Sequence, residues 1–291
     1  MLKRQRLCSS QRRFSPPRKC QQSLLLRLLP PRLLPQRLQL RPRLLQQHLR
    51  HRLRRHLPHL PHLPLPQSNW MVTNWEAPYT AGEEVANSVI HIIGSHLGAA
   101  MIALLVWQAI HSGTDLGWKI TSGCIFGATV ILLYAISGAY HAVTYKPAKD
   151  VLNILDHMAI YFLIAGTYTP FCLVTLRASG HATLAWSIFG VEWAAVIAGV
   201  LVKVWNTGKR HFISTFAYIA MGWVALIAAL PLAHELHAMG FAWLVIGGLL
   251  YTSGCVFYLW RGLPYHHPIW HLFVLAGSLC HFFCILWHVM V

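Results

Sequence analysis

The chain has little charge for its length. Only 11% of its 291 residues are Asp, Glu, Lys or Arg, only 8 of these are acidic, and 55% of the residues are hydrophobic. Soluble domains usually carry about 25% charged residues, so the composition excludes an ordinary soluble domain. The mean hydropathy of +0.46 and the 12 Trp residues agree with this reading. We therefore expect an integral membrane protein.

Several common motifs are also missing. The 7 Cys residues show no paired zinc spacing, and most of them fall within apolar runs, where cysteine usually packs as a small residue. No disulfide framework is implied. The sequence contains neither a phosphate-binding glycine loop nor a nucleophile elbow. The 19 His residues are therefore the main candidates for catalytic or metal-binding side chains.

The basic charge is concentrated at the N-terminus. Residues 1–70 contain 16 of the 24 Lys and Arg residues and no acidic residue, in a low-complexity mixture of Arg, Leu, Gln and Pro. Frequent Pro and Arg disfavour an amphipathic helix, and the segment fits neither a secretory signal nor a transit peptide well. A basic arm could touch anionic lipid or nucleic acid. We prefer to interpret residues 1–70 as an extension that is disordered or results from a start-site artefact, with Met71 as the natural start. We do not expect nucleic acid as a partner.

Residues 71–291 are predicted to form one membrane domain. Seven stretches reach the length of about 20 helical residues that crosses a bilayer. The runs are too long, and too apolar on all sides, for strands of a β-barrel. The sequence therefore predicts an all-α fold, an integral membrane seven-helix bundle. The predicted helices span approximately 88–110, 120–143, 153–175, 181–204, 212–233, 239–260 and 268–290.

The orientation follows from the basic residues between these stretches, because Lys and Arg remain on the cytoplasmic side. The connections after the second, fourth and sixth stretches carry six basic residues, whereas those after the first, third and fifth carry only Lys119 and Arg177. We predict a cytoplasmic N-terminus and an outer C-terminus in the cell (inner or plasma) membrane. The six residues are Lys146, Lys149, Lys203, Lys209, Arg210 and Arg261.

Polar residues in the apolar stretches are predicted to share one depth. His267 and His271 stand one helical turn apart at the start of the seventh stretch, and ionisable side chains at membrane depth are candidates for a functional site. His141 lies at the cytoplasmic end of the second stretch, and Asp156 lies near the cytoplasmic start of the third. Ser137 precedes His141 by one turn. We predict a common site near the cytoplasmic face.

Three neutral imidazoles suit zinc. His141, His267 and His271 could bind Zn²⁺ and leave the fourth tetrahedral position to water, as in catalytic zinc sites. Asp156 could bind or orient that water, and Ser137 could donate a hydrogen bond to a developing oxyanion. The corresponding reaction is hydrolysis of an amide or ester. The alternative is that the histidines form interhelical hydrogen bonds or lie at the lipid interface.

These residues also match a family pattern. Glu84-x-x-Asn87-x-x-x-His91, Ser137-x-x-x-His141, Asp156 and His267-x-x-x-His271 resemble the hemolysin III group of the progestin and adipoQ receptor family, over roughly residues 76–291. The resemblance implies that the three histidines ligate zinc near the cytoplasmic face, with the serine and the aspartate beside it. It also links the fold to alkaline ceramidases and related presumed membrane hydrolases.

Other polar residues in or next to the apolar stretches can have structural or functional roles. Glu84 and Asn87 could cap the first helix while His91 bonds a neighbouring helix, and we prefer this support to direct zinc ligation. His281 lies about 15 Å beyond His271 along a helix, too far for the same metal, so packing or a proton relay remains for it. Glu192 is the one further acid in an apolar run, without a partner that the sequence identifies.

The third stretch contains a break at residues 166–170, Gly-Thr-Tyr-Thr-Pro. We expect a simple kink there, and a bend that lines a substrate site is the alternative.

Three functions remain open from the sequence. The first is a zinc-dependent hydrolase of lipid amides or esters, with membrane lipids as partners and one of them as substrate. The second is a receptor or a regulator of membrane state, in which zinc ties helices together. The third, suggested by the family name, is a pore-forming cytolytic activity, for which an integral seven-helix protein without a soluble phase is poorly suited.

Overall fold

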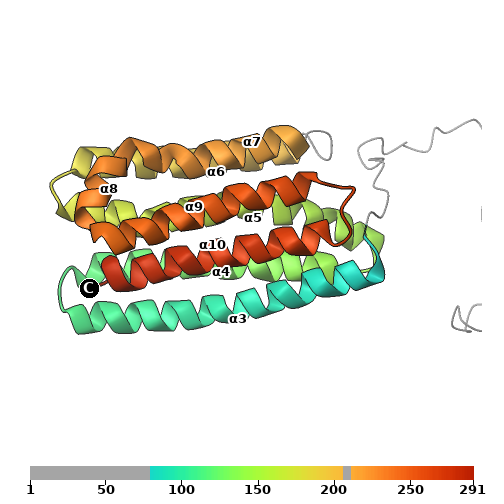
Figure 1. Ribbon diagram of the computed structural model, residues 1–291, viewed down its shortest axis with the longest axis horizontal. Coiled ribbons are helices and arrows are strands. Elements are labelled where there is room, and N and C mark those ends of the chain that lie inside the picture. Colours follow the sequence, from blue (N-terminus) through green and yellow to red (C-terminus); the bar gives the residue numbers. More distant parts are fainter. Residues whose placement is uncertain (1–78, 206–210) are drawn as a thin grey trace, which may run out of the picture. The chain divides into compact units, whose positions relative to one another are not determined.

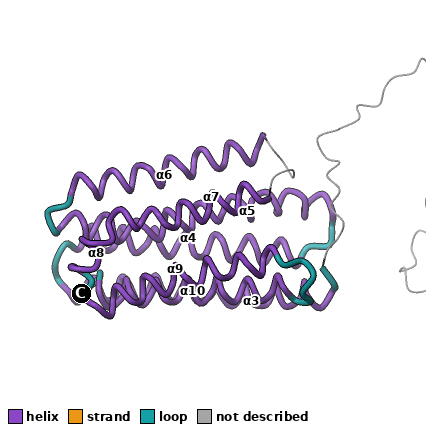
Figure 2. Tube along the Cα trace, turned by 45° about the horizontal axis from the view of Figure 1, so that its top comes forward, coloured by secondary structure: helices purple, strands orange, loops and turns teal. Residues whose placement is uncertain are grey.

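A computed structural model of the protein describes residues 79–205 and 211–291. The predicted extension, residues 1–70, lies outside the described residues, as do Lys209 and Arg210. The described part of the chain is helical and contains no strand (Figures 1 and 2). Its helices are α3 (Ala81–Ser112), α4 (Leu116–Ala142), α5 (Lys146–Pro170), the π-helix η3 (Phe171–Leu176), α6 (Ala182–Trp205), α7 (His211–Gly222), the 3₁₀-helix η4 (Trp223–Ala228), α8 (Ala229–Glu235), α9 (His237–Leu259) and α10 (His266–His288).

Seven helical segments are long and apolar enough to cross a membrane, which confirms the predicted seven-helix fold. Five of them are single helices. The third joins α5 to η3, and the fifth joins α7, η4 and α8. The first three segments begin at Ala81, Leu116 and Lys146, four to seven residues before the predicted starts, because their first turns contain polar residues that an apolar run leaves out. The predicted orientation stays a prediction.

The first helix begins with a capping box. The backbone N–H of Glu83 donates to the Thr80 hydroxyl at 3.3 Å, and the backbone N–H of Thr80 donates to the Glu83 carboxylate at 2.7 Å. These bonds satisfy two backbone donors that have no partner inside the helix. The other oxygen of Glu83 accepts from the backbone N–H of Tyr265, just before α10. The start of α3 is thereby tied to the start of α10.

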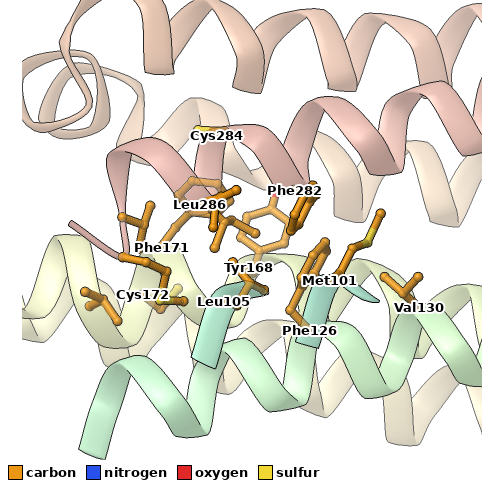
Figure 3. Packing of buried hydrophobic residues seen from close by; sticks show 14 of the residues in the cluster. Met101, Leu105, Phe126, Val130, Tyr168, Phe171, Cys172, Phe282, Cys284 and Leu286 are labelled. Carbon is orange, nitrogen blue, oxygen red and sulfur yellow. The ribbon is translucent and has the colours of Figure 1, made fainter. Parts of the chain in front are cut away.

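The helices pack so that the first, second and seventh membrane segments adjoin. α3 lies beside α4 and α10, α10 lies beside α9, and α5 lies between α4 and α6 (Figure 1). Buried apolar side chains from α3, α4, the α5–η3 junction and α10 fill the interior between them (Figure 3). The labelled members include Met101, Leu105, Phe126, Phe171 and Phe282.

One serine links three helices in this interior. The Ser278 hydroxyl on α10 donates to the backbone carbonyl of Val274 at 3.1 Å, and it lies 2.9 Å from the Tyr134 hydroxyl on α4 and 2.8 Å from the Tyr251 hydroxyl on α9. A hydroxyl has one proton to donate, so both tyrosines donate to the serine oxygen. All three hydroxyls are thus satisfied without water, as an apolar interior requires.

Close approach of α9 and α10 depends on glycine. Gly240, Gly247 and Gly254 are spaced by seven residues and therefore share one face of α9, and all three are buried. A Cβ atom at Gly247 would overlap the ring of His281, whose Nε2 bonds the backbone carbonyl of Leu244 at 3.1 Å. Small residues at such positions let two membrane helices approach closely.

We expect Gly247→Ala to destabilise the protein by about 1–3 kcal/mol, because the His281 ring must move and its hydrogen bond to α9 is strained. Gly248→Ala is the matched control, since a Cβ there meets its nearest side-chain atom only at 4.0 Å. Thermal unfolding of both variants in detergent micelles measures the difference. Equal unfolding temperatures for the two variants would contradict this account of the α9–α10 contact.

Candidate metal centre

Three histidines converge where α4 ends and α10 begins. His141 is the last residue but one of α4, and His267 and His271 occupy the first two turns of α10. The i, i+4 spacing places the last two on one face of α10. All three are buried, with 3%, 5% and 1% of their surfaces exposed. The structure thus brings together the three histidines that the sequence selects.

The ring nitrogens are arranged as a metal ion needs them. One nitrogen from each histidine lies within 4.8 Å of those of the other two, and the Nε2 atoms of His141 and His271 are 3.2 Å apart. Four ligands at zinc–nitrogen distances place neighbouring nitrogens about 3.3 Å from one another. Nε2 of His267 is buried and has no hydrogen-bond partner among the described residues. Buried polar atoms seldom stay unpaired, so the cluster fits a bound cation.

A carboxylate orients His141 from outside the cluster. Nδ1 of His141 lies 2.6 Å from the Glu84 carboxylate, and the other Glu84 oxygen is 2.9 Å from the ammonium group of Lys149. The Asn87 amide lies 3.3 Å from the same Nδ1. A carboxylate on one ring nitrogen fixes the tautomer and turns the other nitrogen toward the metal. Glu84 and Asn87 therefore support the site, and the predicted capping role belongs instead to Thr80 with Glu83.

A tyrosine orients His267 in the same way. The Tyr79 hydroxyl lies 3.0 Å from Nδ1 of His267, and the two rings stack with centroids 4.6 Å apart. Burial raises the pKa of Tyr79, so its phenol stays protonated at neutral pH. With Nδ1 engaged, Nε2 of His267 is left to face the cluster. Tyr79 was not among the residues selected from the sequence, where an aromatic residue before a membrane segment usually indicates only the lipid interface.

Asp156 and Ser137 do not belong to the group of side chains that could share an ion, which consists of the three histidines. The Asp156 carboxylate is 6% exposed, adjoins Ser137, and is within electrostatic reach of His141 and of Lys203 from α6. Ser137 is fully buried, with its hydroxyl beside the Asp156 carboxylate. The roles predicted for these two residues stay predictions. Lys203, predicted only as a charge at a helix end, approaches Asp156 from a fourth helix.

Two other histidines differ in their relation to the site. His91 on α3 is 1% exposed and meets the His271 ring edge to face, with centroids 3.9 Å apart. The hydrogen bond predicted for it is wrong, because neither of its ring nitrogens has a partner. His281 bonds the backbone of Leu244 on α9 and lies outside the cluster, as predicted from its distance along α10.

Seven membrane-spanning segments around a buried histidine cluster define a multi-pass membrane protein. Residues 79–282 match the family model described as "Haemolysin-III related". The chain belongs to this haemolysin-III related family.

Similar proteins come from bacteria and from animals. "Hemolysin-3 homolog" of Bacillus subtilis (strain 168) is 42% identical over 72% of this chain and 96% of its own length. "Hemolysin-3" of Bacillus cereus is 40% identical over 72% of this chain and 92% of its own. "Monocyte to macrophage differentiation factor" of Homo sapiens is 28% identical over 71% of this chain and 84% of its own. The shared region thus contains the helical domain.

Proposed function

We propose that His141, His267 and His271 bind Zn²⁺ and that the protein hydrolyses a lipid amide or ester at this site. The observation that carries the proposal is the convergence of three buried imidazoles whose outer nitrogens, in two cases, are already held by Glu84 and Tyr79. Three protein ligands leave an open fourth position, which is typical of catalytic zinc. When bound, zinc supplies Lewis acidity and makes water reactive near neutral pH.

The residues beside the ligands are suited to move a proton and to bind a developing charge. The Asp156 carboxylate can accept a proton from the attacking water while the water oxygen bonds to the acyl carbon, and it can return that proton to the departing amine or alcohol. The Ser137 hydroxyl is buried beside Asp156 and can donate to the acyl oxygen as charge develops there. The ion pair of Glu84 with Lys149 keeps His141 in place during these steps.

The expected substrate class follows from the surroundings of the site. Its ligands come from helices that are apolar enough to span a membrane, so an acyl lipid can reach it without leaving the bilayer. We place the protein in the cell (inner or plasma) membrane, with the cluster toward the cytoplasm as the loop charges predict.

A second function, a receptor or regulator with structural zinc, is favoured by a different observation. The ligands come from α4 and α10. Glu84 on α3 contacts His141, and Lys149 on α5 contacts Glu84. A metal here would tie four helices together without any chemical step. Cytolysis enters only through the names of the Bacillus relatives, and no contact in the described part of the chain favours it.

The first experiment measures metal content. We expect the purified wild type to contain stoichiometric zinc, and we expect His267→Ala and His271→Ala to lose it, since each removes one ligand. His266→Ala is the matched control, because its ring bonds the backbone carbonyl of Phe257 outside the cluster. Elemental analysis of the three variants beside the wild type decides the matter. A wild type without stoichiometric zinc, purified without chelator, would contradict the proposal.

The contact between Glu84 and His141 predicts a graded effect. We expect Glu84→Gln to weaken zinc binding about 10- to 100-fold, the usual effect of removing a carboxylate that orients a ligating histidine. Competition with a zinc chelator of known affinity measures it. Asp115→Asn serves as the control, because Asp115 pairs with Arg177 at the other end of α4 from His141. An unchanged zinc affinity in Glu84→Gln would show that the carboxylate does not orient the ligand.

Asp156→Asn separates the two functions. For a hydrolase, we expect the variant to keep its zinc and to lose about 100-fold or more of its turnover, because a general base is lost. Asp150→Asn removes an exposed ion pair with Lys146 on the same helix, and it should change neither the zinc content nor the turnover. Release of fatty acid from ceramides and phospholipids in proteoliposomes gives the rate. Zinc retention without any lipid turnover by the wild type would leave the structural function.

A further inference from the structure

A second polar site lies away from the histidine cluster, around Glu192 on α6. Glu192 is 0% exposed, and neither of its carboxylate oxygens has a hydrogen-bond partner among the described residues. It stands ten residues after the start of α6, about 15 Å along the helix, and therefore well inside the apolar span. A buried acid without a partner requires an explanation, and inside a membrane segment it is a candidate functional residue.

Among the described residues, no positive charge faces Glu192. α6 packs against α5 and η3, and the titratable groups that face Glu192 from these elements are the Tyr168 phenol and the Cys172 thiol. Lys203, on α6 itself, is directed to Asp156. An ionised carboxylate in such a place would be neither paired nor hydrated. The carboxylate therefore needs a cation to neutralise it. A metal ion would require several further ligands, whereas a proton requires none.

The backbone next to this carboxyl is irregular in two helices. The π-helix η3 follows Tyr168 closely, and the 3₁₀-helix η4 interrupts the fifth span. The Tyr168 hydroxyl joins the two regions: it lies 3.0 Å from the carbonyl of Met221 and 2.7 Å from that of Gly222, and it accepts from the backbone N–H of Ala225 at 2.7 Å. The predicted kink at residues 166–170 is thus a change of helix type that begins at Phe171.

Tyr168 thus bonds the backbone of the fifth span where α7 passes into η4. Short π and 3₁₀ segments within longer helices often mark places where a helix changes shape. Here a single phenol bonds the irregular part of the fifth span. The residues next to Tyr168 and Glu192 are in contact, since the Trp193 indole N–H donates to the Thr169 hydroxyl at 3.3 Å, so the two side chains lie where α5 and α6 meet. A negative charge on Glu192 would disfavour the present position of the phenol oxygen, because that oxygen carries partial negative charge of its own.

We propose that Glu192 is a proton-binding site inside the membrane, and that loss of its proton is coupled to the hydrogen bonds of Tyr168 with the fifth span. The ligand is a proton, and the site consists of Glu192, Tyr168 and Cys172. It is separate from the histidine cluster and does not depend on zinc. Protonation holds α5, α6 and the η4 region in the arrangement described, and deprotonation weakens it.

Infrared spectroscopy of the full chain in lipid vesicles tests the occupant. With ¹³C-carboxyl glutamate, we expect a protonated-carboxyl band at neutral pH that shifts with the label and in D₂O, and that is absent from Glu192→Gln. The label separates glutamate from Asp156. Glu84→Gln and Glu83→Gln, which should both keep the band, separate Glu192 from the other buried or partly buried glutamates. A glutamate signal that is entirely carboxylate at neutral pH would overturn the proposal. Loss of the band on adding Na⁺ would also overturn it, because a metal ion would then be the ligand.

A second arm tests the coupling. Tyr168→Phe removes the hydroxyl, and we expect the pH at which the Glu192 band disappears to move by at least about one unit, a tenfold change in proton affinity. Tyr161→Phe is the matched control, since Tyr161 lies on the same helix and packs against Tyr218 instead. An identical titration in Tyr168→Phe and the wild type would overturn the coupling and leave an isolated protonated acid.

Discussion

The cost of an unpaired polar group in apolar surroundings governs the arrangement of this protein. Inside a bilayer no water is at hand, so each buried hydroxyl, imidazole or carboxyl needs a partner from the protein or a ligand. The hydroxyl of Ser278 joins three helices, and that of Tyr168 bonds the backbone of the fifth span. Among the described residues, the buried atoms without a hydrogen-bond partner include Nε2 of His267 in the histidine cluster and both carboxylate oxygens of Glu192. A ligand at either place would complete the structure.

The histidine cluster depends on how α10 returns to the first helices. α10 packs against α3 and α9, and the bond from Tyr265 to Glu83 fixes its first turn beside that of α3. From this position His267 and His271 meet His141 at the end of α4. Close packing of α9, permitted by its glycine face, holds α10 from the other side. The site is thus built by helix ends that are far apart in the sequence, and their contacts outside the cluster set its geometry.

Hydropathy was enough to predict the seven spans, and the i, i+4 spacing placed His267 and His271 on one helical face. His141 could be added because the loop charges place the ends of its helix and theirs at the same depth. The outer contacts could not be predicted. Glu83 and Glu84 are adjacent acids at a helix start, and the sequence does not show which one caps the helix and which one turns toward His141. Tyr79 and Lys203 acquire their roles only from tertiary contacts. The burial of Glu192 was predictable from its apolar run, whereas its facing residues required the path of η3.

Helix α5 connects the two polar sites. Asp156 lies before the middle of α5, with His141 within electrostatic reach, and Tyr168 lies near its end, on the side of α6 and Glu192. The twelve helical steps from Asp156 to Tyr168 span about 18 Å of continuous α-helix, which transmits displacement better than a loop does. The histidines themselves are held by α4 and α10, so a shift of α5 would move Asp156 relative to all three of them. If α5 has two positions and the protonated form of Glu192 stabilises one of them, proton binding also sets the position of Asp156, the proposed general base.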